Sequence, residues 1–203
     1  RRWRDDARSF ESLALFGWDE ETLTVPGEPR RIGVLKVDNG FLPTLGVRPR
    51  IGRNFTSEES SPGQGEVVIV TDRFWRRELE ADPDPLSRRV TLNGRTRRIV
   101  GVLPPDFQLF DSRRIGPFAA EVGEVDVFRP QEILPRHLEL GEFNFSAIGR
   151  LREGVSLEQA TTELNVLQAA ITADTPELAA QDMKLEVVVR PLAATLAGDS
   201  AHG

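Results

Sequence analysis

The sequence predicts an α+β fold in which several short strands are mixed with few helices. The clearest local signal is a β-hairpin: Val90–Leu92 and Arg98–Leu103 flank Asn93-Gly94, a pair that tolerates the positive φ angles of a tight type I′ turn. One long amphipathic helix is predicted in the last third of the chain. Strands and helices do not alternate regularly, so the pattern favours α+β or split βαβ modules over a doubly wound sheet.

The N-terminal quarter predicts two strands and a short helical turn. Apolar residues alternate loosely over Phe10–Val25, which indicates a strand or a hairpin. A second strand is predicted at Arg31–Val37. The segment Phe41–Gly46 predicts a single helical turn that ends at Gly46.

A polar segment, Thr56–Gly65, is the clearest loop of the first half and a candidate boundary. The apolar run in Glu66–Thr71 predicts a short buried strand. Asp72 is a suitable N-cap for a helix over Arg73–Glu80. The prolines of Asp82–Pro85 stop this helix, because proline cannot continue the ladder of hydrogen bonds.

The C-terminal part predicts strands at Val125–Phe128, Phe145–Arg152 and Lys184–Val189. Between the last two lies the helix, which starts with a capping box formed by Ser156 and Gln159. Its predicted apolar stripe consists of Leu157, Ala160, Leu164, Leu167 and Ile171.

Composition excludes several classes of function. The 203 residues are 39% hydrophobic and 29% charged, which is ordinary for a globular protein. The net charge is −6, and acidic residues are interleaved with most of the arginine pairs, which is unlike the basic face that binds nucleic acid. There is no cysteine, so disulfides, thiolate zinc sites and cysteine nucleophiles are excluded.

Residues suited to catalysis or cofactor binding are sparse. The two histidines, His137 and His202, lie in loop-like segments, and no phosphate-binding loop or nucleophile elbow occurs. The acidic residues of Glu58-Glu59 and Asp82–Asp84 lack the calcium-loop pattern and are interpreted as structural. We therefore expect no catalytic residue, cofactor or metal site. A hydrolase based on two of the 32 acidic residues stays open as an alternative.

The ends of the sequence indicate a piece of a longer protein. The chain opens on Arg1-Arg2-Trp3-Arg4 without an initiator methionine or a signal peptide, and no apolar run approaches the roughly 20 residues that span a bilayer. We therefore expect a fragment of a longer protein. A free-standing periplasmic ligand-binding protein is the alternative.

Four segments, in this order along the chain, together resemble the periplasmic core domain of MacB/FtsX-like ABC transporter permeases, above all the large duplicated permeases of acidobacteria. They are Leu45–Phe55, Phe74–Phe107 with its Phe-Trp-Arg-Arg, Asn-Gly and Val-Gly-Val-Leu-Pro-Pro-Asp-Phe stretches, Ile148–Ala160, and Leu196–Asp199. Ser87 and Pro85 depart from the expected glycine and aliphatic residue. Nothing is carried over to residues 111–142, which match poorly.

The resemblance implies a two-lobed domain. A porter-like lobe of βαβ units would be formed by residues 1–55 and 140–192, with a small α/β lobe inserted at residues 56–139 and a linker toward the next membrane helix at 193–203. The residues that carry the resemblance would be structural signatures of the fold: Trp75, Asn93, Gly94, Gly101, Pro105, Phe107, Gly149 and Gly154.

The resemblance also implies a non-catalytic role at the periplasmic face of the bacterial inner membrane. Such a domain couples motion driven by a cytoplasmic ATPase to the handling of a substrate or partner in the periplasm. The implied partners are the permease's own transmembrane helices, a second permease copy, the ATPase and, in some members, a periplasmic adaptor. No cofactor and no nucleic acid are implied.

Overall fold

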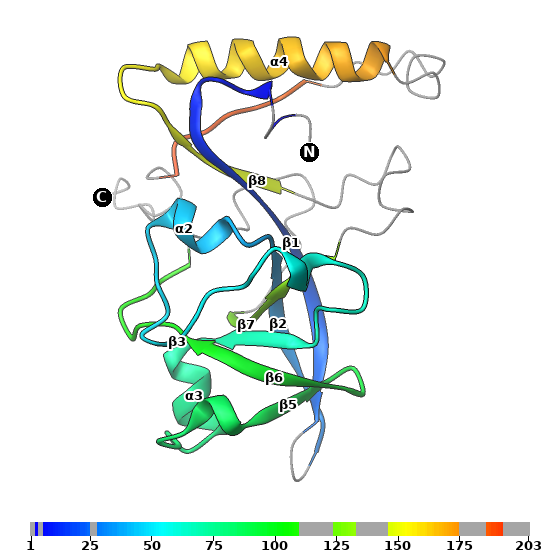
Figure 1. The fold of residues 1–203 in the computed structure, drawn as a ribbon, viewed down its shortest axis with the longest axis vertical. Helices are drawn as coiled ribbons and strands as arrows, with labels where there is room; N and C mark the ends of the chain where they lie inside the picture. Colours follow the sequence, from blue (N-terminus) through cyan, green and yellow to red (C-terminus); the bar gives the residue numbers. More distant parts are fainter. Residues whose placement is uncertain are drawn as a thin grey trace, which may run out of the picture.

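The structure, a computed structural model, describes residues 3, 6–24, 28–109, 124–132, 146–174 and 186–192. Within these residues the chain forms a mixed sheet with a few helices, an α+β architecture (Figure 1). The elements are, in order, β1 (Phe10–Thr24), β2 (Arg30–Val37), α2 (Phe41–Leu45), β3 (Ile51–Gly52), η1 (Glu58–Ser60), β4 (Val67–Val70), α3 (Asp72–Glu78), η2 (Pro85–Ser87), β5 (Arg89–Leu92), β6 (Arg95–Val102), β7 (Val125–Pro130), β8 (Ser146–Leu151) and α4 (Leu157–Ala173).

Six strands pair in a closed ring. The order of pairing is β1-β2-β7-β4-β6-β5, and β5 pairs again with β1. The β2–β7 and β4–β6 pairs are parallel and the other ring pairs are antiparallel. Because the ring is closed, each of the six strands pairs with a neighbour on both sides over at least part of its length. This protects the sheet from pairing with other chains.

The long strand β1 belongs to two parts of the molecule. Its second half, from Phe16 to Leu23, pairs with β2 inside the ring. Its first half, from Phe10 to Phe16, pairs with β8 outside the ring. In Figure 1, α4 lies across one end of the molecule and the ring lies at the other, with β1 running between them.

Three apolar clusters hold these parts together. One lies on one face of the ring strands and includes Phe41 and Leu42 of α2. Another lies on the opposite face, where it includes Phe74 and Trp75 of α3. The third packs Ala160 and Leu164 of α4 against Phe10 of β1. Both faces of the sheet are therefore covered.

Several elements form for the local reasons that the sequence predicts. Asn93 and Gly94 adopt φ angles of 49° and 74°, so the hairpin turn has the predicted positive φ values. Gly46 ends α2 in the left-handed conformation, with φ of 75°. The capping box of Ser156 and Gln159 starts α4 as predicted.

Other local predictions are wrong in detail. The N-cap of α3 is Thr71, whose hydroxyl accepts from the Phe74 N–H, and not Asp72, which is the first residue of the helix. Leu157, predicted to lie in the apolar stripe of α4, is among the exposed hydrophobic residues. Residues 186–190 do not form a regular strand, and residues 184–185 of that prediction lie outside the described residues.

The division into two lobes stays a prediction. The ring joins β1 and β2, which precede residue 56, to β4–β7, which follow it. None of the described helices is both long and apolar enough to cross a membrane.

Candidate functional surfaces

The eight signature residues lie at separate positions and do not converge on one site. Trp75 is a buried residue of α3, and its indole N–H donates to the Asp82 carbonyl at 2.9 Å. Phe107 packs edge-on against Phe128, with 5.8 Å between ring centroids. Pro105 is exposed in the turn that precedes Phe107. Each of these three has a packing or turn environment of its own.

Two of the signature glycines lie where a side chain would collide with its surroundings. A Cβ atom at Gly101 would lie 2.7 Å from the Arg53 carbonyl oxygen. A Cβ atom at Gly149 would lie 2.5 Å from the Phe10 ring, at the β8–β1 contact. Close packing of neighbouring strands therefore requires glycine at both positions.

Two other glycines and Asn93 serve turns. The Asn93 N–H donates to the Thr22 carbonyl, and the Asn93 side-chain oxygen accepts from the Thr22 N–H, so the hairpin turn is fastened to β1. Gly94 and Gly154 have φ angles of 74° and 79°, with open space around them. That these eight residues mark the family stays a prediction.

A buried group of charges lies inside the ring. Glu21 of β1 contacts Arg97 of β6 at 3.5 Å and Arg129 of β7 at 2.7 Å. The side chains of Glu21 and Arg97 are only 1% and 3% exposed. Because β1 pairs with neither β6 nor β7, these ion pairs cross the interior of the ring.

Arg97 is held mainly by the end of the hairpin. Its guanidinium donates to the Leu92 carbonyl at 2.9 Å. Its Nε atom lies 3.9 Å from a carboxylate oxygen of Glu66, and neither atom has a hydrogen-bond partner. Burial lowers the pKa of the Arg97 guanidinium, and the charge of Glu21 partly offsets this effect. Glu21, Arg97 and Arg129 thus form a group of ion pairs inside the ring.

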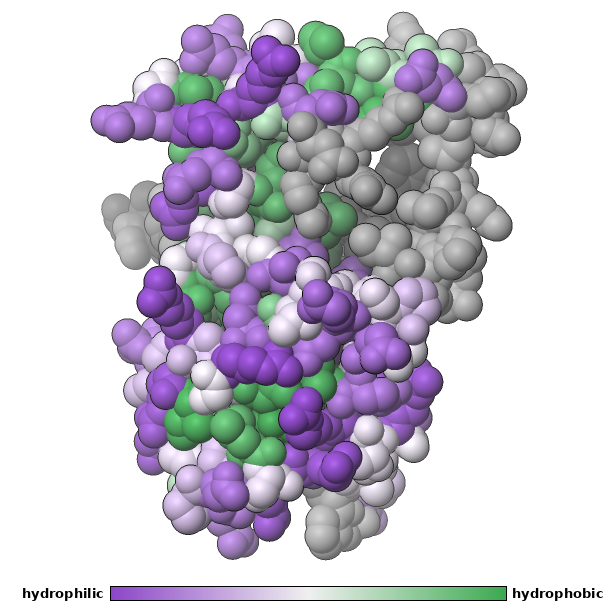
Figure 2. Space-filling view, in the orientation of Figure 1, coloured by the Kyte–Doolittle hydropathy of each residue, from purple (hydrophilic) through white to green (hydrophobic). Residues whose placement is uncertain are grey.

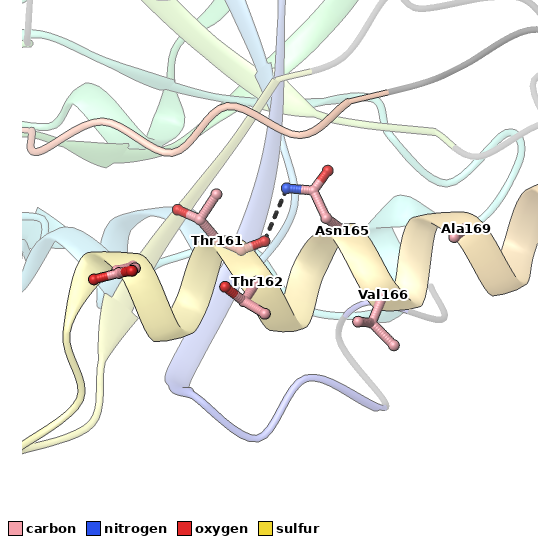
Figure 3. Close-up of a pocket in the computed structure, with 6 residues that line it drawn as sticks. Thr161, Thr162, Asn165, Val166 and Ala169 are labelled. Carbon is pink, nitrogen blue, oxygen red and sulfur yellow. Dashed lines mark hydrogen bonds between the residues drawn. The ribbon is translucent and has the colours of Figure 1, made fainter.

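A shallow groove runs along α4, and Figure 3 shows its lining residues spread along the helix. The lining residues are Glu158, Thr161, Thr162, Asn165, Val166 and Ala169. Val166 is 64% exposed, and Figure 2 shows apolar surface along α4 at the top of the view. Five of the six lining residues are uncharged and Glu158 is the charged one, so the groove is suited to a contact surface.

Two side chains of α4 hold distant segments of backbone. The Glu163 carboxylate accepts from the N–H groups of Arg8 and Ser9 at 2.7 and 2.8 Å. The Asn165 amide bonds to both the N–H and the carbonyl of Val187, at 2.8 and 3.1 Å. Sequence reasoning missed both residues, because a polar residue beside the apolar stripe of an amphipathic helix is indistinguishable from ordinary surface polarity.

The acidic candidates are engaged in local structure. Glu59 forms two bonds with the Arg53 guanidinium and accepts from the Thr56 N–H. Asp82 accepts from the Asp84 N–H in the turn after α3. His137 and His202 lie outside the described residues. In the part of the chain that the structure describes, no group of three or more His, Cys, Asp or Glu residues is placed to hold a metal ion.

Comparison with known proteins agrees with the architecture. The family model of the MacB-like periplasmic core domain matches residues 5–167. No match was found among curated proteins.

Three solved structures share the fold at low sequence identity. The periplasmic region of MacB from Actinobacillus actinomycetemcomitans is 14% identical, with a TM-score of 0.60, covering 88% of this chain and 79% of that one. The extracellular domain of the noncanonic ABC-type transporter YknZ from Gram-positive bacteria is 12% identical, with a TM-score of 0.58 and coverage of 82% and 79%. A domain described as belonging to a permease protein of Porphyromonas gingivalis is 18% identical, with a TM-score of 0.61 and coverage of 83% and 73%.

Proposed function

Because the chain belongs to the family of MacB-like periplasmic core domains, we propose that it is the extracytoplasmic domain of an ABC transporter permease. Its role is to carry motion, driven by ATP hydrolysis in the cytoplasm, to a substrate or partner outside the membrane. The domain itself is not catalytic. Its proposed partners are the permease's membrane helices, a second permease copy, the ATPase and a periplasmic adaptor.

The observation that carries the coupling role is the path of β1. This strand has 15 residues, a length of about 50 Å at about 3.3 Å per residue. One half is fixed in the ring by β2, and the other half is fixed to β8 beside α4. A displacement at either end of the molecule is therefore passed along one continuous, hydrogen-bonded element.

A second contact supports the same role. Arg150 of β8 donates to the Thr44 carbonyl at the end of α2, and the Thr44 hydroxyl lies 3.0 Å from that of Ser12 on β1. Since α2 packs on the ring through Phe41 and Leu42, it braces the junction between the ring and β8.

The location is tested with a membrane-impermeant maleimide. This chain has no cysteine, so Val166→Cys in an otherwise cysteine-free permease places one reactive thiol on an exposed position. We expect labelling in intact spheroplasts. Labelling that requires permeabilised membranes would overturn the extracytoplasmic assignment. Val34→Cys, which is fully buried, is the matched control and should react only after denaturation.

The coupling is tested with spin labels at the same cysteine in two copies of the reconstituted permease. We expect the distance distribution between labels to change when ATP and vanadate are added. Gly149→Val, which forces Phe10 and β8 apart, should reduce this change while ATP hydrolysis stays within about twofold of wild type. An unchanged distance in the wild-type permease would contradict the proposal.

A further inference from the structure

The segment that leads into β1 is fastened to α4 and β8 by side chains. Glu163 accepts two backbone N–H groups, from Arg8 and Ser9. Arg152, in the turn after β8, donates from Nε to the Arg8 carbonyl at 3.0 Å, and its own N–H donates to the Ser9 carbonyl. Both the N–H groups and the carbonyl oxygens of residues 8–9 are therefore hydrogen-bonded.

The segment after α4 is held by the side-chain amide of Asn165. The side-chain nitrogen of Asn165 donates to the carbonyls of Thr161 and Val187, and its oxygen accepts from the Val187 N–H. No backbone-to-backbone hydrogen bond joins residues 186–190 to the rest of the described chain. Val187 and Val189 contact the α4 cluster, whereas Val188 is 67% exposed.

The two fastening residues are two positions apart on one helix. At 100° per residue they project from different sides of α4, and Leu164 between them is buried against Phe10. The helix is thus anchored through its apolar face while each flank holds a different segment.

From this geometry we infer that α4 clamps two separate segments of the chain. Glu163 holds residues 8–9 and Asn165 holds Val187, and we call these two sets of hydrogen bonds the latches. A force on either segment is transmitted to the same helix. The inference deepens the proposed function and rests on it for the source of the pull. The latches themselves are properties of this chain.

Hydrogen exchange of the 203-residue chain tests each latch separately. In Asn165→Ala we expect the Val187 amide to exchange at least tenfold faster, with Arg8 and Ser9 unchanged. In Glu163→Ala we expect the reverse. Amides of β2 and β6 should keep wild-type rates in both variants, because neither latch touches the ring.

Matched controls lie on the same helix. Gln168→Ala removes an amide whose side-chain contact is with Thr172 of α4, and Glu158→Ala removes a carboxylate from the first turn. Both should leave residues 8–9 and 187 at wild-type exchange rates. Unchanged exchange at the latched segment, equal acceleration in the controls, or acceleration throughout β2 and β6 would each overturn the clamp.

The spin-labelled permease separates this inference from the proposed function. If α4 relays motion, each latch variant should reduce the ATP-dependent change in label distance at least twofold, and the two controls should retain it. A full response in both latch variants would overturn the relay. An unchanged label distance in the wild-type permease would overturn both the proposed function and the relay. In that case the hydrogen-exchange experiment would still test the two latches.

Discussion

The stability of the ring interior depends on Glu21. It is the buried carboxylate that contacts both Arg97 and Arg129. Removing one partner of a buried ion pair leaves an uncompensated charge, which costs about 3–5 kcal/mol. We expect Glu21→Gln to lower the free energy of unfolding by an amount in this range, measured by urea denaturation.

The neighbouring residue supplies the control. Glu20 pairs with Arg31, but both side chains are more than half exposed. Since exposed pairs contribute about 0–1 kcal/mol, Glu20→Gln should change stability by less than about 1 kcal/mol. Similar losses for the two variants would show that the charges inside the ring do not act as a buried network.

The buried charges mark where sequence reasoning stops at the residue scale. The alternation of apolar and polar residues in β1 and β6 predicts strands and assigns polar positions to the solvent side. In a closed ring, however, one side of each strand faces other strands, so Glu21 and Arg97 are buried. Closure depends on pairing between segments far apart in sequence, which local pattern does not contain.

At the scale of elements, the start of α3 gives a sharp test. The Thr71 hydroxyl accepts from the Phe74 N–H at 3.1 Å and caps the helix. Loss of such a cap costs about 1 kcal/mol, so Thr71→Ala should reduce the free energy of unfolding by about that amount. Thr71→Ser keeps the hydroxyl and should lose much less. Equal losses in the two variants would show that the methyl group, not the cap, matters.

Local chemistry determines which elements could be predicted. The Asn93-Gly94 turn, the capping box of α4 and the Gly46 stop each depend on residues within one turn of the chain, and all three are found. The strand β7 runs to Pro130, although proline favours a stop, because Pro130 is its last residue and the next N–H, from Gln131, makes the bond to the Val37 carbonyl.

At the scale of the whole molecule, the ring places strands from before and after residue 56 in one sheet. A fragment of residues 56–139 would lack β1 and β2, so β5 and β7 would each have an open edge and Arg97 would lose Glu21. We expect this fragment to give a poorly dispersed amide NMR spectrum or to aggregate, and residues 6–139 to retain a dispersed spectrum. A cooperatively folded 56–139 fragment would instead support an independent lobe.

Acid should destabilise the whole domain through carboxylates spread over its length. Burial alone would raise the pKa of Glu59, but hydrogen bonds from Arg53 and the Thr56 N–H bring it below its ordinary value of 4.5. The pKa of Glu78 is lowered by Arg77 and Arg30 and that of Glu163 by the N–H groups of Arg8 and Ser9, again against the effect of burial.

The sign of the pH dependence follows from these directions. A carboxylate whose pKa is lower in the folded state stabilises that state above its unfolded pKa, and this stabilisation is lost as the pH falls through the folded value. The urea midpoint should therefore be nearly constant from pH 7 to about 5 and fall below about pH 4.5. Glu59→Gln should flatten the fall, because its Arg53 contact no longer titrates, whereas Glu153→Gln, on an exposed turn, should not. A fall of equal size in wild type and Glu59→Gln would place the acid sensitivity in other groups.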